Sequence, residues 1–204
     1  MNTIMPELNT YEEYNSVAEK NGIVFLGSNY FYSLPVCELA QDYKLNEVIY
    51  NRSIPNCCID QIADKLNTCV MQLSPKKIFV NIGEEDIKNV NLDIDEFMAK
   101  YEWLLYTIHT QTNADIYIVS IISSSPLALE INRRLKTLAK ETGSQYIDLG
   151  RINSYPKPNL KIFDILRFYL RNHPITFTEA MNMATVKTQI IKEAVAAKYI
   201  FYII

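Results

Sequence analysis

The stretch "IVFLGSNYF" at residues 23–31 begins with four apolar residues, which run into a glycine and then into small polar groups. A continuous apolar run of this length is typical of a strand that is buried on both faces of a parallel sheet. Binding and catalytic groups of such sheets lie where the strands end, at the carboxyl edge. The stretch therefore predicts a buried strand and a tight loop that places Ser28 and Asn29 at a site.

Similar runs recur along the chain and define the sheet. With the first strand at 22–26, apolar runs rich in Val, Ile, Phe and Tyr occur at 47–51, 77–83 and 115–122, and a weaker one at 144–149. Their near-continuous apolar character indicates strands that are covered on both faces. We expect a parallel sheet of five strands in a flavodoxin-like arrangement.

Helical spacing fills the intervals between these strands. Apolar residues three and four positions apart predict helices over 59–70, 94–108 and 127–138, and a last helix over about 178–197. The proline-containing stretch at 154–159 is interpreted as a loop. Strands that alternate with helices indicate a three-layer α/β/α sandwich, and the whole chain, 1–204, is expected to form a single domain.

Composition excludes several classes of function. The net charge of −3 and an isoelectric point near 5.5 lack the basic excess of a nucleic-acid-binding protein. No segment approaches the roughly 20 apolar residues that a membrane-spanning helix needs. We therefore expect neither a nucleic-acid partner nor a membrane partner. The apolar end "YIFYII" at 199–204 is interpreted as core or as an interface, which leaves a homo-oligomer open.

The four cysteines are expected to be reduced thiols in a cytoplasmic protein. They show no CxxC spacing, and residues 1–22 lack the basic and apolar regions of a signal peptide. The adjacent pair Cys57 and Cys58 leaves a redox role open, although free cysteine is also a common core residue.

Several blocks together resemble the SGNH/GDSL hydrolases. The strand that ends at Gly27 is followed by "NRSIPNCC", by "PKKIFVNIGEEDI" and, before the last helix, by "NHPITFTEA". The resemblance covers about residues 22–195 with the order and spacing of the family. It implies the SGNH fold and the activity of a GDSL-type esterase or acylhydrolase, and we expect no cofactor. In that family a Gly-Asp-Ser nucleophile, a block II glycine, a block III asparagine and an Asp-x-x-His pair form the catalytic site.

Position by position, this chain departs from that pattern. Ser28 stands where the family has aspartate, and Asn29 stands where it has the nucleophilic serine. Ser53 replaces the block II glycine, and Glu85 replaces the asparagine that would complete the oxyanion hole. Asp86 and His173 match the family, whereas Leu170 occupies the position of the orienting aspartate.

These departures bear directly on the chemistry. Acyl transfer of this type needs a nucleophilic hydroxyl, a base within hydrogen-bond reach of it and a group that orients the base. An asparagine amide is not a nucleophile, and an ionised Glu85 would repel the negative charge that develops in the transition state. Ser28 could replace the nucleophile only from a position one residue earlier, and it is otherwise interpreted as a turn or cap residue.

Other acidic and basic residues near the expected site have alternative explanations. His173 is either a pocket-facing base or a surface residue, and Asp148 and Asp164 are candidates to orient it. The run from Glu84 to Asp86 does not predict a metal site, because three consecutive acids cannot all converge on one ion. Asp86 is expected to cap the following segment and Glu84 to be solvated.

The sequence leads to two hypotheses about function, and a third remains as an alternative. The first is a degenerate SGNH protein that binds a small molecule, with Asn29, Ser53, Glu85 and Asp86 lining its pocket. The second is an active esterase or acetylhydrolase in which Ser28 attacks an ester substrate and His173 is the base. The third is a flavodoxin-like domain without pocket chemistry.

Overall fold

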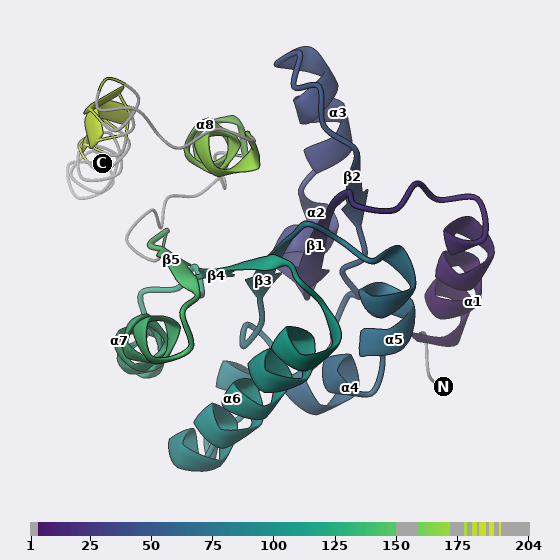
Figure 1. Ribbon diagram of the computed structural model, residues 1–204. Coiled ribbons are helices and arrows are strands. Elements are labelled where there is room, and N and C mark those ends of the chain that lie inside the picture. The colour runs from purple at the N-terminus through teal and green to yellow at the C-terminus, as the bar shows by residue number, and fades with distance from the viewer. Residues whose placement is uncertain are drawn as a thin grey trace, which may run out of the picture.

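Five parallel strands form one sheet in the centre of the computed structural model (Figure 1). The strands are β1 (Ile23–Gly27), β2 (Ile49–Asn51), β3 (Lys77–Asn81), β4 (Asp115–Val119) and β5 (Gln145–Ile147), in the order β2-β1-β3-β4-β5. The structure describes residues 4–149 and 159–171, together with 178, 181, 182, 184–186, 188, 189 and 192. The predicted flavodoxin-like sheet and three-layer architecture are confirmed.

Two groups of helices cover the two faces of the sheet. The helices α4 (Ile59–Ala63), α5 (Leu66–Cys69), α6 (Ile94–Gln111) and α7 (Pro126–Glu141) pack on one face. Figure 1 shows α6 and α7 on this side of the sheet and α8 on the other.

The opposite face is covered by α2 (Asn29–Ser33), α3 (Val36–Asp42) and α8 (Asn159–Leu170). An N-terminal helix, α1 (Ile4–Asn15), packs against α5 beside the sheet. Because helices cover both faces, every residue of the inner strands β1 and β3 is buried regardless of the face to which its side chain points, whereas the edge strands β2 and β5 are partly exposed. This explains why the strands lack apolar–polar alternation.

An aromatic ladder runs across the second face of the sheet. Phe25, Phe79 and Tyr117 are register partners on β1, β3 and β4, and their rings stack at centroid distances of 4.8 and 4.7 Å. Phe31 meets Phe25 edge-on at 4.9 Å from α2, and Tyr169 approaches Tyr117 from α8. The ladder thus connects the strands β1, β3 and β4 to the helices α2 and α8.

The helix predicted over 59–70 is interrupted. It is divided into α4, α5 and the 3₁₀ turn η1 (Met71–Leu73), because the backbone leaves helical geometry at Lys65 and at Val70. The loop predicted at 154–159 lies outside the described residues up to 158, and residue 159 begins α8. The last helix, predicted over 178–197, lies largely outside the described residues, and those positions in it that are described are helical.

The strand order places a topological switch between β1 and β3. In parallel sheets of this order, ligands bind at the carboxyl ends of the strands beside the switch. Gly27 ends β1 at that point, where a Cβ would lie 2.5 Å from the Asn81 carbonyl oxygen of β3. Only glycine allows the two strand ends to approach so closely.

No described helix is both long enough and apolar enough to cross a bilayer. All four cysteines are free: Cys57 and Cys69 are buried, Cys58 is half-buried and Cys37 is exposed. Burial raises the pKa of the Cys69 thiol to about 12 and also raises the pKa of Cys58. The predicted free thiols are therefore confirmed, and the Cys57–Cys58 pair is not bridged.

Candidate functional site

The loops that follow β1, β2 and β3 meet at the carboxyl edge of the sheet. They carry Ser28 and Asn29, then Ser53, then Glu85 and Asp86, so the structure brings together five of the residues that the sequence singled out. Side chains make several of the bonds between these loops, and each of these five residues has a hydrogen-bond partner.

Asn29, the first residue of α2, is fixed in place by hydrogen bonds of its side-chain amide. Its Nδ2 donates to Oε1 of Glu85 and, at 3.3 Å, to Oδ1 of Asn56. Its Oδ1 accepts from the backbone N–H of Asn56 at 2.8 Å. Asn56 has a left-handed backbone, with φ of 56°, which is common for asparagine in turns. Both ends of the Asn29 amide are thus engaged by neighbouring loops.

Glu85 lies where the family resemblance expects a hydrogen-bond donor. Its side chain is 12% exposed, and its Oε1 accepts from both Asn29 and Lys88, which forms an ion pair with it. The position holds a paired carboxylate that points to the residue at the nucleophile position. An acceptor has therefore replaced a donor at this point of the site.

Glu84 is half-buried, and the prediction that it is solvated is wrong. Its Oε2 accepts from the backbone N–H of Tyr30 at 2.9 Å, in the first turn of α2. A carboxylate at this end of a helix is favoured because the first amides of a helix lack partners within it. The sequence gave no indication of this contact, because Glu84 lies 54 residues from Tyr30.

Ser28 is fully buried. Its Oγ accepts from the backbone N–H of Cys57 at 3.2 Å, whereas it makes no side-chain cap on α2. The hydroxyl does satisfy a free amide, as expected, but that amide belongs to the loop after β2 and not to the following helix. Ser28 therefore connects the loop after β1 to the loop after β2.

Ser53 is also buried, and its backbone amide is already bonded. The N–H donates to Oδ1 of Asn51 at 3.2 Å, and the carbonyl accepts from the Tyr11 hydroxyl at 2.8 Å. The Ser53 hydroxyl donates to the Phe25 carbonyl at 3.4 Å. Each polar group of Ser53 thus has a partner inside the protein.

Asp86 ties the loop after β3 to the start of α4. Its Oδ1 accepts from the backbone N–H of Ile59 at 3.1 Å, so the prediction that Asp86 caps the segment after it is wrong. Only 7% of Asp86 is exposed, and its other oxygen, Oδ2, has no hydrogen-bond partner among the described residues. Burial raises the pKa of this carboxyl above its ordinary range, although the bond from Ile59 opposes the shift.

The region of the predicted base is only partly described. His173 lies outside the described residues. Leu170, at the position of the family's orienting aspartate, is fully buried at the end of α8. Asp164 forms an ion pair with Arg167 on the same helix, at 3.0 Å, and Asp148 is exposed. The roles proposed for these two aspartates beside His173 stay predictions.

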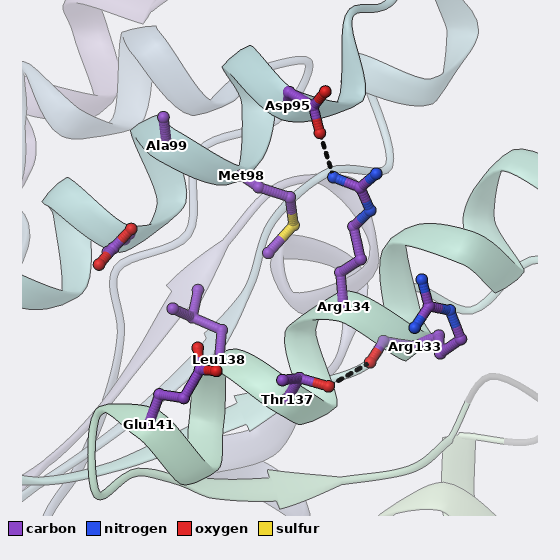
Figure 2. Close-up of a pocket in the computed structure, with 9 residues that line it drawn as sticks. Asp95, Met98, Ala99, Arg133, Arg134, Thr137, Leu138 and Glu141 are labelled. Carbon is purple, nitrogen blue, oxygen red and sulfur yellow. Dashed lines mark hydrogen bonds and ion pairs between the residues drawn. The ribbon is translucent and has the colours of Figure 1, made fainter.

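Two cavities lie near these elements. One, of about 270 Å³, adjoins the site and is lined by Glu85 and Asp86 among others. The larger, of about 390 Å³, is an open groove between α6 and α7 that contains none of the predicted site residues. Figure 2 shows that Arg134 reaches across this groove to Asp95. Its guanidinium is therefore already paired within the protein.

Comparison with known proteins identifies the fold. No family model matches the chain, and no curated protein matches it. A GDSL-like lipase from Bacteroides thetaiotaomicron matches with a TM-score of 0.59 and 15% identity over 92% of this chain and 98% of its own. A catalytic mutant of Axe2, an acetylxylan esterase from Geobacillus stearothermophilus, matches with a TM-score of 0.53 and 13% identity over 85% of this chain and 95% of its own.

At these identities the matches show a common fold. The chain has the α/β fold of the GDSL-like lipases and esterases, and the resemblance that the sequence blocks indicate is confirmed at that level.

Proposed function

We propose that this chain is an SGNH-fold protein that binds a small molecule at the carboxyl edge of its sheet and does not hydrolyse esters by the Ser-His-Asp route. The observation that carries the proposal is the hydrogen bond between Asn29 and Glu85. It joins the residue at the nucleophile position to the residue at the oxyanion position, and neither has the chemistry that its position requires.

The nucleophile position offers no attacking group. The nitrogen of a carboxamide has its lone pair delocalised into the carbonyl, and Asn29 also uses both ends of its amide in bonds to Asn56 and Glu85. Nucleophilic catalysis needs a hydroxyl or thiol that an adjacent base can activate. Of the two thiols in these loops, that of Cys57 is buried, and that of Cys58 has a raised pKa, so little of it is thiolate at neutral pH.

The oxyanion position is hostile to negative charge. At an effective dielectric constant of about 20, a carboxylate about 4 Å from a developing oxyanion opposes it by about 4 kcal/mol. Loss of a single donor already costs about 2.7–4 kcal/mol. The amide of Ser53, at the block II position, is bonded to Asn51, so it is not free to compensate.

The alternative esterase with Ser28 as nucleophile is not favoured. Ser28 is buried, and its Oγ already accepts a hydrogen bond from the amide of Cys57. To attack a substrate it would have to leave that amide unsatisfied, and a misplacement of about 1 Å alone can lower turnover about a hundredfold.

Fluorophosphonate labelling tests the proposal, because such probes react with activated serines. The full chain is treated beside an active esterase, and any adduct is located by mass mapping. We expect no adduct. An adduct at Ser28 that disappears in Ser28→Ala, together with hydrolysis of an aryl acetate that is lost in His173→Ala, would establish the esterase instead.

A thermal-shift screen of small molecules tests the binding half of the proposal. Because a ligand that binds only the folded state raises the melting temperature with concentration, a saturable shift identifies a ligand without assuming a reaction. The matched variant is Glu85→Gln, which keeps the acceptor oxygen for Asn29 but removes the charge.

A further inference from the structure

The helix α6 carries an uncharged line of side chains on the side that faces solvent. This line, the α6 stripe, consists of Ala99, Trp103, Tyr106 and Thr110, at successive spacings of four, three and four residues. All four residues are exposed, and the exposed fractions of Trp103 and Tyr106 are 56% and 66%. Among the side chains that the structure describes, no other helix exposes two large apolar ones.

The opposite side of α6 already faces the core of the protein. Its buried residues are Phe97, Tyr101, Leu104, Leu105 and Ile108. A helix at the surface of a globular protein normally has one apolar face and a polar face opposite to it. The α6 stripe is a second apolar line, and exposed apolar patches of this kind mark surfaces that pack against a partner.

The hydroxyl groups on this side of α6 bond to the helix itself. Thr107 donates through Oγ1 to the carbonyl of Trp103 at 2.9 Å, and Thr110 donates to the carbonyl of Thr107 at 3.1 Å. The hydroxyl hydrogens are thus satisfied within α6. A partner can cover this face without leaving these donors buried and unpaired, which would cost stability.

Charged side chains on both flanks of the stripe are paired within the chain. Lys100 bridges Asp60 and Glu96 at 2.8 Å each on one flank. On the other flank, Asp95 pairs with Arg134, as Figure 2 shows. An apolar centre that contains Trp and Tyr, inside a polar rim, is the arrangement found in protein–protein interfaces.

The distribution of charge along α6 favours a second copy of this chain in the reversed direction. Asp95, Glu96 and Glu102 all lie in the first half of the helix, whereas residues 103–111 contain no carboxylate, and their titratable side chain is that of His109. Two antiparallel copies of α6 place the acidic half of each against the carboxylate-free half of the other. A parallel pair would oppose like charges, which costs binding energy.

The spacing of the stripe agrees with that pairing. Spacings of four, three and four read the same in both directions, so a reversed α6 presents the same stripe to the first. Trp103 then lies opposite Tyr106 of the second copy, and Ala99 lies opposite Thr110. A two-fold dimer needs a surface that is complementary to itself in this way.

We propose that the chain forms a two-fold homodimer through the α6 stripe, with the helices antiparallel and the four rings of Trp103 and Tyr106 at the centre. At about 150–250 Å² for a fully covered aromatic side chain, the exposed fractions of these two residues correspond to about 180–300 Å² per chain. A standard interface buries about 800 Å² per partner. The dimer is therefore expected to be weak and to depend on concentration.

The full chain provides its own reporter, because Trp103 is its single tryptophan. Sedimentation equilibrium and tryptophan fluorescence are measured over the micromolar to millimolar range in which small interfaces associate. We expect a monomer to convert to a dimer as the concentration rises. Over the same transition, the emission should shift to shorter wavelength and acrylamide quenching should fall severalfold.

Three results would overturn the proposal. The first is a monomer with an accessible Trp103 at every concentration. The second is a monomer in which Trp103 is shielded from acrylamide, because another segment of the same chain would then cover the stripe. The third is a dimer that forms without any change at Trp103, which would place the interface on another surface.

Two matched substitutions separate the stripe from a general effect of surface charge. Trp103→Lys is expected to weaken dimerisation at least about tenfold, because a large aromatic anchor at the centre of an interface is lost. Tyr14→Lys changes a similarly exposed aromatic residue, at 54%, on α1, and it should alter dimerisation less than about twofold. Thermal unfolding shows whether both variants remain folded, and equal losses in the two contradict the assignment.

Cysteine cross-linking tests the direction of the helices, in a Cys37→Ser background that removes the exposed cysteine. Ala99→Cys protein is oxidised alone, Thr110→Cys protein is oxidised alone, and the two are then oxidised as a mixture. We expect a disulfide-linked dimer in the mixture, because these two positions lie opposite each other only in the antiparallel pair. A linked dimer of Ala99→Cys alone, with none added by mixing, overturns the antiparallel arrangement.

Discussion

The substitution Asp86→Asn should change how the stability of the fold depends on pH. Burial is the main reason that the pKa of Asp86 is raised above 3.8, and the nearby charge of Asp60 adds to it. The N–H of Ile59 and the ammonium of Lys100 act in the opposite direction. The folded state therefore binds the Asp86 proton more tightly than the unfolded chain does.

The sign of the pH dependence follows from that difference. When the folded pKa of an acid exceeds its unfolded pKa, its contribution to stability is full below the unfolded value and declines as the pH rises through the folded value. Asp86→Asn has no such titration. The free energy of unfolding of the wild type minus that of Asp86→Asn should thus fall from about pH 4 to about pH 7, by about 1.4 kcal/mol for each unit by which the pKa is raised.

Urea unfolding across this pH range measures the difference, provided that the slopes with denaturant stay equal between the two proteins. Glu102→Gln is the control, because it removes the same charge from an exposed position on α6. Its difference from the wild type at each pH is the baseline with which that of Asp86→Asn is compared. A wild type that gains stability over Asp86→Asn as the pH rises would show that the carboxylate is stabilised in the fold, and the argument would be refuted.

Three further substitutions test the packing of the sheet and its helices. Phe79→Ala removes the middle ring of the aromatic ladder and should lower the free energy of unfolding by about 3–5 kcal/mol; a loss below about 1 kcal/mol in urea unfolding contradicts the ladder. Tyr101→Phe removes a buried hydroxyl that has no hydrogen-bond partner among the described residues, so thermal unfolding should show equal or higher stability. Lys77→Met removes the ammonium that donates to the carbonyls of Tyr169, in the last turn of α8, and of Arg171, just after it, which should cost about 1–3 kcal/mol and speed amide exchange in α8; unchanged exchange argues against that contact.

The sheet could be read from the sequence because both of its faces are covered. Each strand then appears as a continuous apolar run, and all five were located. The short helices could not be found in the same way. The helix α3 spans seven residues, which is too few to show a helical period, and the break between α4 and α5 occurs at Lys65 without a proline or glycine.

The candidate site was predictable in its positions and not in its contacts. Asn29 and Glu85 were identified from their places in the sequence blocks, but they lie 56 residues apart, and nothing in the sequence shows that their side chains meet. Asn56 and Glu84 were missed for the same reason. A residue's identity sets what it can donate or accept, whereas its partner depends on which rotamers the packed loops allow.

The polar groups of this carboxyl edge fall into two sets with opposite implications. Asn29, Ser28 and Ser53 are bonded to the protein itself, and the bonds of Asn29 and Ser28 join the loop after β1 to the loop after β2. Asp86 differs, because it is buried, its carboxyl is destabilised in its charged form, and one of its oxygens has no partner among the described residues. Its carboxylate therefore lowers the stability of the fold as the pH rises through its raised pKa, and the comparison with Asp86→Asn measures by how much.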